Sequence, residues 1–187
     1  MQLIKNYFEY VQNPAQALKE LIAKPSFKQS CCGYLVAALS WVLFFNIGDG
    51  LSVPEFLVKL LIVFLAELTA GSFMAALSGL FLAFRGKKIS PSQLFVLLGS
   101  AGFIKSLLIA FALVSACFPY AQMWMLAPLG ILLVFALQLG YLTSALCRTE
   151  GTSVTLGLVA WLFGIVPVSA LFALLITFFV WMIILIV

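Results

Sequence analysis

The sequence predicts an all-α, polytopic transmembrane helix bundle of about five spans, preceded by N-terminal amphipathic interfacial helices. Hydrophobic residues make up 65% of the 187 residues and charged residues only 9%, whereas soluble domains are about 45–50% apolar and about 25% charged. The mean hydropathy is +1.22, and long apolar runs follow one another along the chain. A soluble domain of this size has too much surface to cover with so few charges, and a disordered chain would be poor in apolar residues.

Residues 1–25 are predicted to form two short amphipathic helices on the cytoplasmic face. Over residues 1–12, apolar side chains recur at helical spacing and polar side chains take the other face. A second helix is capped by Asn13 and ends at Pro25. We expect both helices to lie in the membrane interface. The alternative is that they pack on the protein's own loops.

Five apolar runs are predicted to form the spans, since a transmembrane helix needs about 20 residues. Ser26, Ser52 and Ser90 precede the first three runs, each with a Gln or Glu three residues later, which is typical of helix starts. The last run contains Gly164 and Pro167 and is too long for one upright helix. We expect one kinked or tilted helix there, with a re-entrant turn followed by a span as the alternative. The predicted transmembrane domain covers residues 26–187, with spans at about 28–47, 55–84, 92–118, 126–147 and 154–187.

The distribution of Lys and Arg predicts the orientation of these spans. Eight of the ten basic residues lie before the first span, between the second and third, or after the fourth. By the positive-inside rule these segments are cytoplasmic. The N-terminus is therefore expected inside and, with five spans, the C-terminus outside. The net charge of +4 is spread along the chain and is too small for nucleic-acid binding. The expected partners are the lipid bilayer and other membrane proteins or a second copy of this chain.

Glu67 and Lys105 are ionisable residues that lie deep within apolar runs. Glu67 is 21 residues before Lys88 in the intervening loop and Lys105 is 17 after it, so their depths differ by about 6 Å along a helix axis. A lysine side chain can cover much of that distance, which makes a direct ion pair feasible. With Gln138 at middle depth in the fourth span, we predict a buried polar cluster of Glu67, Lys105 and Gln138. Such a cluster either fixes helix pairing, which we favour, or forms a proton or substrate site.

Small residues follow Glu67 at four-residue steps and form a predicted helix-packing stripe of Gly71, Ala75, Gly79 and Ala83. Stripes of this kind allow helix backbones to approach closely, so Glu67 is predicted to face the bundle interior. The sequence has no histidine and no C-x-x-C pair, which removes the commonest general base and argues against a zinc site. We therefore expect a non-enzymatic protein with no catalytic, cofactor-binding or metal residues.

Three stretches of the sequence resemble the Yip1 family of small five-span membrane proteins. They are NPAQALKELIAKPSF before the first span, RGKKISPSQLFVLLGSAGF at the start of the third, and GYLTSALCRTEGTSVTLGLVAWL across the last loop. The resemblance covers about residues 13–187 and is greater to the compact prokaryotic members. It implies the five-span fold and a location in a prokaryotic cytoplasmic (plasma) membrane.

The first function that we expect is a non-enzymatic, membrane-organising or adaptor role, exerted through helix–helix and lipid contacts. The resemblance itself implies the fold and the topology and transfers no activity. Eukaryotic members of the family are associated with Rab-type GTPases and carry a longer acidic N-terminal region. This sequence shows no such region, so we do not expect Rab-type GTPase binding. The alternative is a small-molecule or ion transporter, or a membrane subunit of a transport complex, with its site at Glu67 and Lys105 near the midplane.

Overall fold

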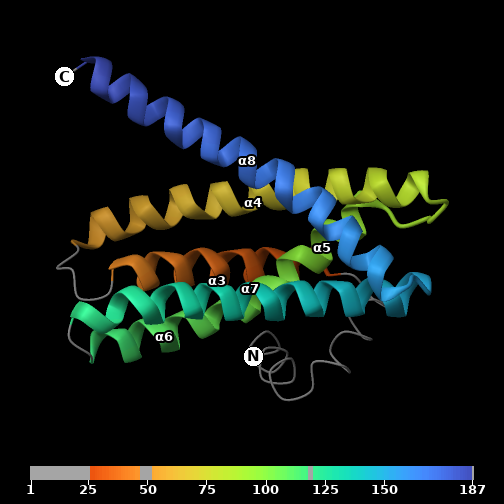
Figure 1. The fold of residues 1–187 in the computed structure, drawn as a ribbon, viewed down its shortest axis with the longest axis horizontal. Coiled ribbons are helices and arrows are strands. Elements are labelled where there is room, and N and C mark those ends of the chain that lie inside the picture. The colour runs from red at the N-terminus through yellow and green to blue at the C-terminus, as the bar shows by residue number, and fades with distance from the viewer. Residues whose placement is uncertain (1–25, 47–51, 118–119, 187) are drawn as a thin grey trace.

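The computed structural model describes residues 26–46, 52–117 and 120–186, and over these residues it contains helices and no strand. The elements are α3 (Phe27–Asn46), α4 (Val53–Phe84), α5 (Pro91–Ala101), the 3₁₀ segment η1 (Gly102–Ser106), α6 (Leu107–Ala116), α7 (Tyr120–Glu150) and α8 (Val154–Ile186) (Figure 1). The all-α prediction is confirmed. The amphipathic helices predicted within residues 1–25 lie outside the described residues.

Within the described residues, five helical segments are long and apolar enough to cross a membrane, as predicted. They are Phe27–Asn46, Val53–Phe84, Pro91–Val114, Ala127–Arg148 and Val154–Met182. The third of these segments is composite, because α5, η1 and α6 follow one another without a loop. The surface agrees with a membrane environment, since large hydrophobic side chains such as Ile62, Leu132 and Leu174 are more than 60% exposed. The chain is therefore an integral membrane protein.

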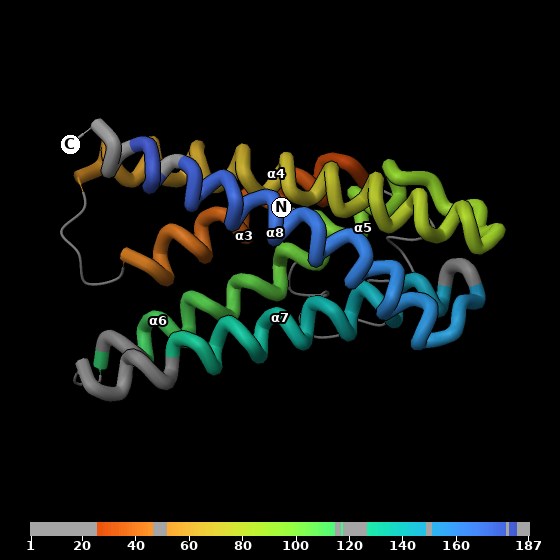
Figure 2. Tube along the Cα trace, turned by 45° about the horizontal axis from the view of Figure 1, so that its top comes forward, coloured from red at the N-terminus to blue at the C-terminus, as the bar shows by residue number. Residues whose placement is uncertain are grey.

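Helix α3 lies at the centre of the bundle and packs against α4, α5, η1 and α6. Helix α4 also packs against α5 and α8, and α7 packs against α6 and α8. As a result α4 and α7 lie on opposite sides of α3, which both views of the chain show (Figure 1, Figure 2). In this arrangement α4 and α7 are outer helices, and α3 and η1 are packed between them.

Glycines allow α3 and the third span to pack backbone against backbone. A Cβ atom added at Gly33 would collide with the carbonyl oxygen of Gly99, and one added at Gly102 would lie only 2.5 Å from the carbonyl oxygen of Gly33. One turn along, the hydroxyl of Tyr34 donates to the carbonyl oxygen of Phe95 at 3.1 Å. The close approach places η1 directly against α3, because a side chain at any of these glycines would hold the helices apart.

The predicted packing stripe of α4 faces other helices of the same chain over most of its length. Gly71 lies against the ring of Tyr34, where a Cβ atom would collide with it, and Gly79 lies against Pro91 of α5. Ala75, between them, is 1% exposed. The stripe therefore serves contacts of α4 with α3 and α5 of the same chain.

Ala83 departs from the predicted stripe, because it is exposed. Each four-residue step turns a residue about 40° past its predecessor on an α-helix with 3.6 residues per turn. Three steps from Gly71 therefore rotate Ala83 by about 120°, out of the interface. Leu82, one residue earlier, is fully buried and takes the inward position.

Helix α8 runs without interruption from residue 154 to residue 186, with Pro167 inside it. The prediction of a single helix is thus met, and the described chain contains no re-entrant turn there. Gly164 does not break the helix; it lies against Ser78 and the backbone of Met74, which allows α8 to cross α4 closely. After Val168 no described side chain of α8 is buried. In Figure 1 α8 crosses α4 near its middle, and the later part of α8 extends obliquely away from α4 toward the C-terminus.

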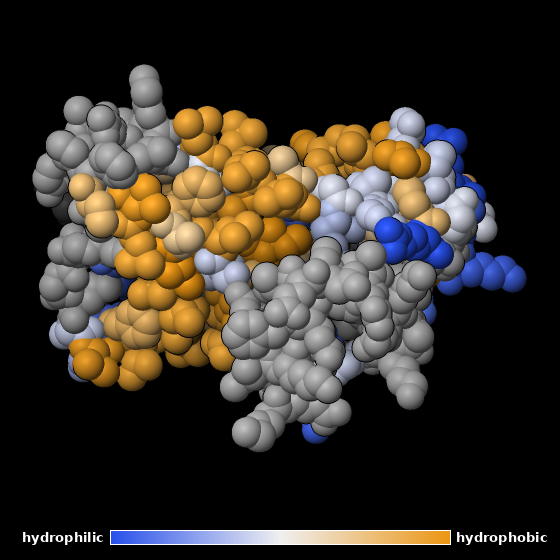
Figure 3. All heavy atoms as spheres, turned by 90° about the horizontal axis from the view of Figure 1, so that it is seen from below, coloured by the Kyte–Doolittle hydropathy of each residue, from blue (hydrophilic) through white to orange (hydrophobic). Residues whose placement is uncertain are grey.

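Basic residues gather at one end of the bundle. In the space-filling view the hydrophilic side chains of the described residues concentrate at this end, while hydrophobic side chains cover the middle (Figure 3). Two described lysines lie elsewhere, Lys59 in the first half of α4 and Lys105 in η1. The residues at the basic end are Lys28, Arg85, Lys87, Lys88 and Arg148.

Candidate functional site

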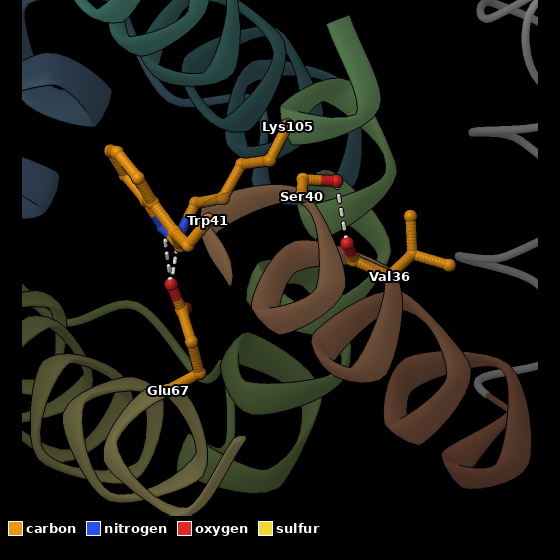
Figure 4. Close-up of polar contacts among 5 residues, drawn as sticks. All are labelled: Val36, Ser40, Trp41, Glu67 and Lys105. Atoms are coloured by element: carbon orange, nitrogen blue, oxygen red, sulfur yellow. Dashed lines mark hydrogen bonds and ion pairs between the residues drawn. The ribbon is translucent and has the colours of Figure 1, made fainter. Parts of the chain in front are cut away.

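A carboxylate oxygen of Glu67 is the meeting point of three elements (Figure 4). The ammonium Nζ of Lys105 in η1 lies 2.6 Å from Glu67 Oε1, and the two groups form an ion pair. The indole Nε1 of Trp41 in α3 donates to the same oxygen at 2.9 Å. The Oε1 atom of Glu67 on α4 thus bonds to side chains of both α3 and the third span.

The 3₁₀ segment η1 positions Lys105. A 3₁₀ helix has about 3.0 residues per turn and rises about 2.0 Å per residue, so side chains leave it in directions that a continuous α-helix would not give. This segment begins at Gly102, which lies against the backbone of α3. The ammonium of Lys105 also lies 5.7 Å from the centre of the Trp41 ring, a distance at which a cation is attracted to the face of an indole. The close packing at Gly102 and the local change of helix type together determine where the Lys105 side chain lies.

The side chains of Glu67 and Lys105 are largely buried, but each keeps a small exposed fraction. The exposed fraction is 14% for the Lys105 side chain and 17% for that of Glu67. A second ion pair in α4, between Lys59 and Glu55 at 3.3 Å, is 39% and 53% exposed. Lys59 additionally donates to the side chain of Asn46 at 2.8 Å. The described chain therefore contains two pairs of the same chemical type, one inside the bundle and one on its surface.

A cavity of about 190 Å³ lies beside the inner ion pair. Its wall includes side chains of α3, α4, α5, η1, α7 and α8, and most of them are apolar. Liquid water takes about 30 Å³ per molecule, so the volume suits a few waters or a small organic group. The polar members of the wall are Tyr34, Trp41, Glu67, Lys105 and Gln138.

Gln138 of α7 lines this cavity together with Glu67 and Lys105. Within the described residues, however, no hydrogen bond joins its side chain to either of them. The predicted cluster is therefore an ion pair with a neighbouring amide on the same cavity, and Trp41 is the third bonded member. The amide of Gln138 keeps its donors and its acceptor for a molecule in the cavity.

Two features of the site were not anticipated from the sequence. One is Trp41, and the available signal was that a tryptophan within an apolar span needs an acceptor for its indole N–H. The other is the 3₁₀ segment that carries Lys105. Gly99 precedes this segment and Gly102 begins it, at helical spacing. Glycines in a transmembrane helix indicate close packing and do not by themselves indicate a change of helix type.

The site offers binding groups for a polar molecule. Glu67 Oε1 accepts two hydrogen bonds, and an ionised carboxylate has a second oxygen with further acceptor positions. Lys105 uses one of its three ammonium donors for Glu67. In the described part of the chain no three acidic or cysteine side chains come together as metal ligands would. The arrangement can hold a ligand by hydrogen bonds and charge.

Comparisons of the chain with models of protein families, with curated proteins and with solved structures find no match.

Proposed function

We propose that the protein is a small-molecule transporter, or a membrane subunit of a transport complex, whose substrate binds in the cavity beside Glu67 and Lys105. The observation that carries the proposal is the position of Lys105, a charged residue on the 3₁₀ segment η1 of the third span, which lines a cavity near mid-span. Transporters commonly place their substrate sites near the bilayer midplane, where a span departs from a regular α-helix.

A purely structural ion pair accounts for less of this geometry. A pair that only fixes helix pairing requires good geometry and apolar enclosure, and it requires no cavity beside it. Here the pair forms part of a cavity wall and keeps some exposure on both side chains. The 3₁₀ segment adds a position at which the third span can bend, since such segments within helices often mark hinges.

The proposal is tested by the molecule that the protein retains when it is purified from native membranes in mild detergent. Mass spectrometry of the purified protein is expected to detect a retained small molecule. Glu67→Gln removes the charge, and Ala70→Leu reduces the cavity that Ala70 lines. Both variants are expected to lose the molecule. After reconstitution, vesicles with the unmodified protein are expected to take up that molecule faster than vesicles with either variant.

Matched controls lie on the same helix. Glu55→Gln removes a carboxylate from the surface ion pair, and Ala76→Leu enlarges an alanine that is exposed on α4. Both controls are expected to retain the molecule at the unmodified level. Equal retention in all four variants, or a protein that retains nothing, would contradict the proposed site.

A membrane-organising or adaptor role is the second candidate. One observation favours it, namely that α8 beyond Val168 exposes apolar side chains such as Leu174, at 68%, which is a surface suited to another membrane protein as well as to lipid. A cysteine in place of Leu174 is expected to form a stoichiometric cross-link to one partner in native membranes. Cross-linking at background level counts against this role.

A further inference from the structure

The cavity beside Glu67 opens between α4 and α7. These helices flank the cavity, and they are not among the helix pairs of the described chain that pack against each other extensively. On the α7 side the lining residue Phe135 is 46% exposed. On the α4 side Ala70 and Met74 line the cavity and are partly exposed.

The opening faces hydrocarbon, because its residues lie far from both helix ends. Glu67 and Ala70 occupy the middle of α4, and Gln138 the middle part of the fourth span. The first half of α8 closes the cavity at one side, where Ile165 lines it. Beyond Val168, none of the side chains of α8 that the structure describes is buried. A molecule that leaves the cavity between α4 and α7 therefore enters the bilayer laterally.

The walls favour a ligand that is apolar over most of its surface. Tyr34 and Trp41 line the cavity, but their polar atoms are already bonded to Phe95 and Glu67. The polar groups with capacity left are those of Glu67, Lys105 and Gln138, which together present both donors and acceptors. A hydroxyl group, which donates one hydrogen bond and accepts others, matches such a set.

The charges of the site select against a charged ligand. Glu67 and Lys105 have opposite charges 2.6 Å apart, and together they are neutral. An anion would compete with Glu67 for Lys105, and a cation would compete with Lys105 for Glu67. Either way one charge remains without a partner in a place that water reaches poorly, which is costly. A head group without net charge avoids this cost.

We infer that the ligand of this cavity is a lipid-like amphiphile with a small hydroxyl-bearing head group and no net charge. The inference rests on the proposed function, and it adds the chemical class of the substrate and its route. The head group binds at Glu67, Lys105 and Gln138, and the hydrocarbon chain leaves between α4 and α7 into the bilayer. The ligand therefore reaches its site from the membrane.

The test uses the full chain in nanodiscs and four probes. Monoolein has an uncharged hydroxyl head and a chain, oleate has a negative head, oleylamine has a positive head, and glycerol has the head without a chain. Binding is measured by titration with native mass spectrometry. Monoolein is expected to saturate a single site and to bind about tenfold more tightly than oleate or oleylamine, a difference equivalent to about 1.4 kcal/mol.

Two variants relate the binding to the cavity. Ala70→Leu is expected to weaken monoolein binding about tenfold, because the added carbons occupy space that the ligand needs. Ala76→Leu, on the exposed side of the same helix, is expected to leave the affinity unchanged. A photoreactive monoolein is expected to label α4 and α7 near Ala70 and Phe135 in preference to the exposed end of α8.

Three outcomes would overturn the inference: tighter binding of oleate or oleylamine than of monoolein, glycerol binding as tightly as monoolein, or equal monoolein binding by both alanine variants. The proposed function fails separately, when the molecule retained from native membranes is insensitive to Glu67→Gln and Ala70→Leu. A retained water-soluble molecule that is lost in those variants, together with absent monoolein binding, would overturn the ligand class and leave the site in place.

Discussion

Lys105 Nζ lies 2.6 Å from Glu67 Oε1, although the two residues are 38 positions apart in the sequence. The ion pair joins a 3₁₀ segment in the third span to the middle of α4, and Trp41 of α3 donates to the same oxygen. Three helical elements thus depend on one carboxylate, at the wall of a cavity. Changes at this carboxylate are expected to affect both stability and ligand binding.

The inner ion pair is expected to show strong energetic coupling. Glu67→Gln or Lys105→Met leaves the other charge without its partner in an enclosed place, which we expect to lower the free energy of unfolding by about 1–3 kcal/mol. Exchanging both residues in Glu67→Gln/Lys105→Met is expected to recover much of that loss, because no unpaired charge then remains. A double-mutant cycle based on reversible unfolding in detergent micelles measures the coupling.

The surface pair of Glu55 and Lys59 provides the control for this cycle. Its side chains are more exposed, and surface ion pairs contribute about 0–1 kcal/mol. A cycle with Glu55→Gln and Lys59→Met is therefore expected to give a small coupling. Equal couplings for the two pairs would contradict the enclosed character of the Glu67–Lys105 pair.

The glycine contact between α3 and the third span is expected to tolerate no side chain. A Cβ atom at Gly33 would collide with the backbone of Gly99, so Gly33→Ala must separate the two helices. We expect this substitution to lower the stability by about 1–3 kcal/mol, as overpacking generally does. Since η1 rests on α3 at this point, the variant is also expected to weaken ligand binding at Lys105. Thermal unfolding and ligand retention measure the two effects.

Gly140 in α7 provides the control for Gly33→Ala, because a Cβ atom added at Gly140 meets no other atom within 4 Å. Gly140→Ala is expected to leave stability unchanged or to raise it by up to about 1 kcal/mol, since alanine favours the helix over glycine. If Gly33→Ala were as stable as Gly140→Ala, the close approach of α3 and α5 would not be a constraint on the fold.

The basic end of the bundle is expected to be cytoplasmic. Cys117 is exposed at the end of α6, and Lys88 is exposed in the loop at the opposite, basic end. In a chain without the other cysteines, a membrane-impermeant maleimide is expected to label Cys117 in intact cells. A chain in which Lys88→Cys replaces Cys117 as the single cysteine is expected to react only after permeabilisation. Both should react in detergent, and the reverse labelling pattern would overturn the orientation.

For α4 and α8, the helix bounds predicted from the sequence agree closely with those in the structure. The run predicted at 55–84 corresponds to α4 at 53–84, and the run at 154–187 to α8 at 154–186. The start of α5 was predicted from Ser90 and Gln93, which form the expected reciprocal cap in the structure. Helix starts and apolar lengths are local properties, so the residues near each boundary suffice to determine them.

The candidate site was only partly accessible from the sequence. The depth comparison placed Glu67 and Lys105 at similar heights, because helix rise is constant along a regular span. It could not assign Trp41 to Glu67, since that contact depends on how α3 turns its side chains toward α4. It also treated the third span as one regular helix, whereas η1 changes the direction in which Lys105 leaves the backbone.

The amino-acid sequence by itself predicted an all-α membrane protein of about five spans, because hydropathy and helix caps depend on neighbouring residues. Which faces of those helices pack against each other became known only from the tertiary structure. It brought Gly33 against Gly99, turned Ala83 outward, and left a cavity beside Glu67 and Lys105. In a bilayer every outer surface is apolar, so hydrophobic patterning marks inner faces weakly, and close packing of side chains and backbones makes the choice.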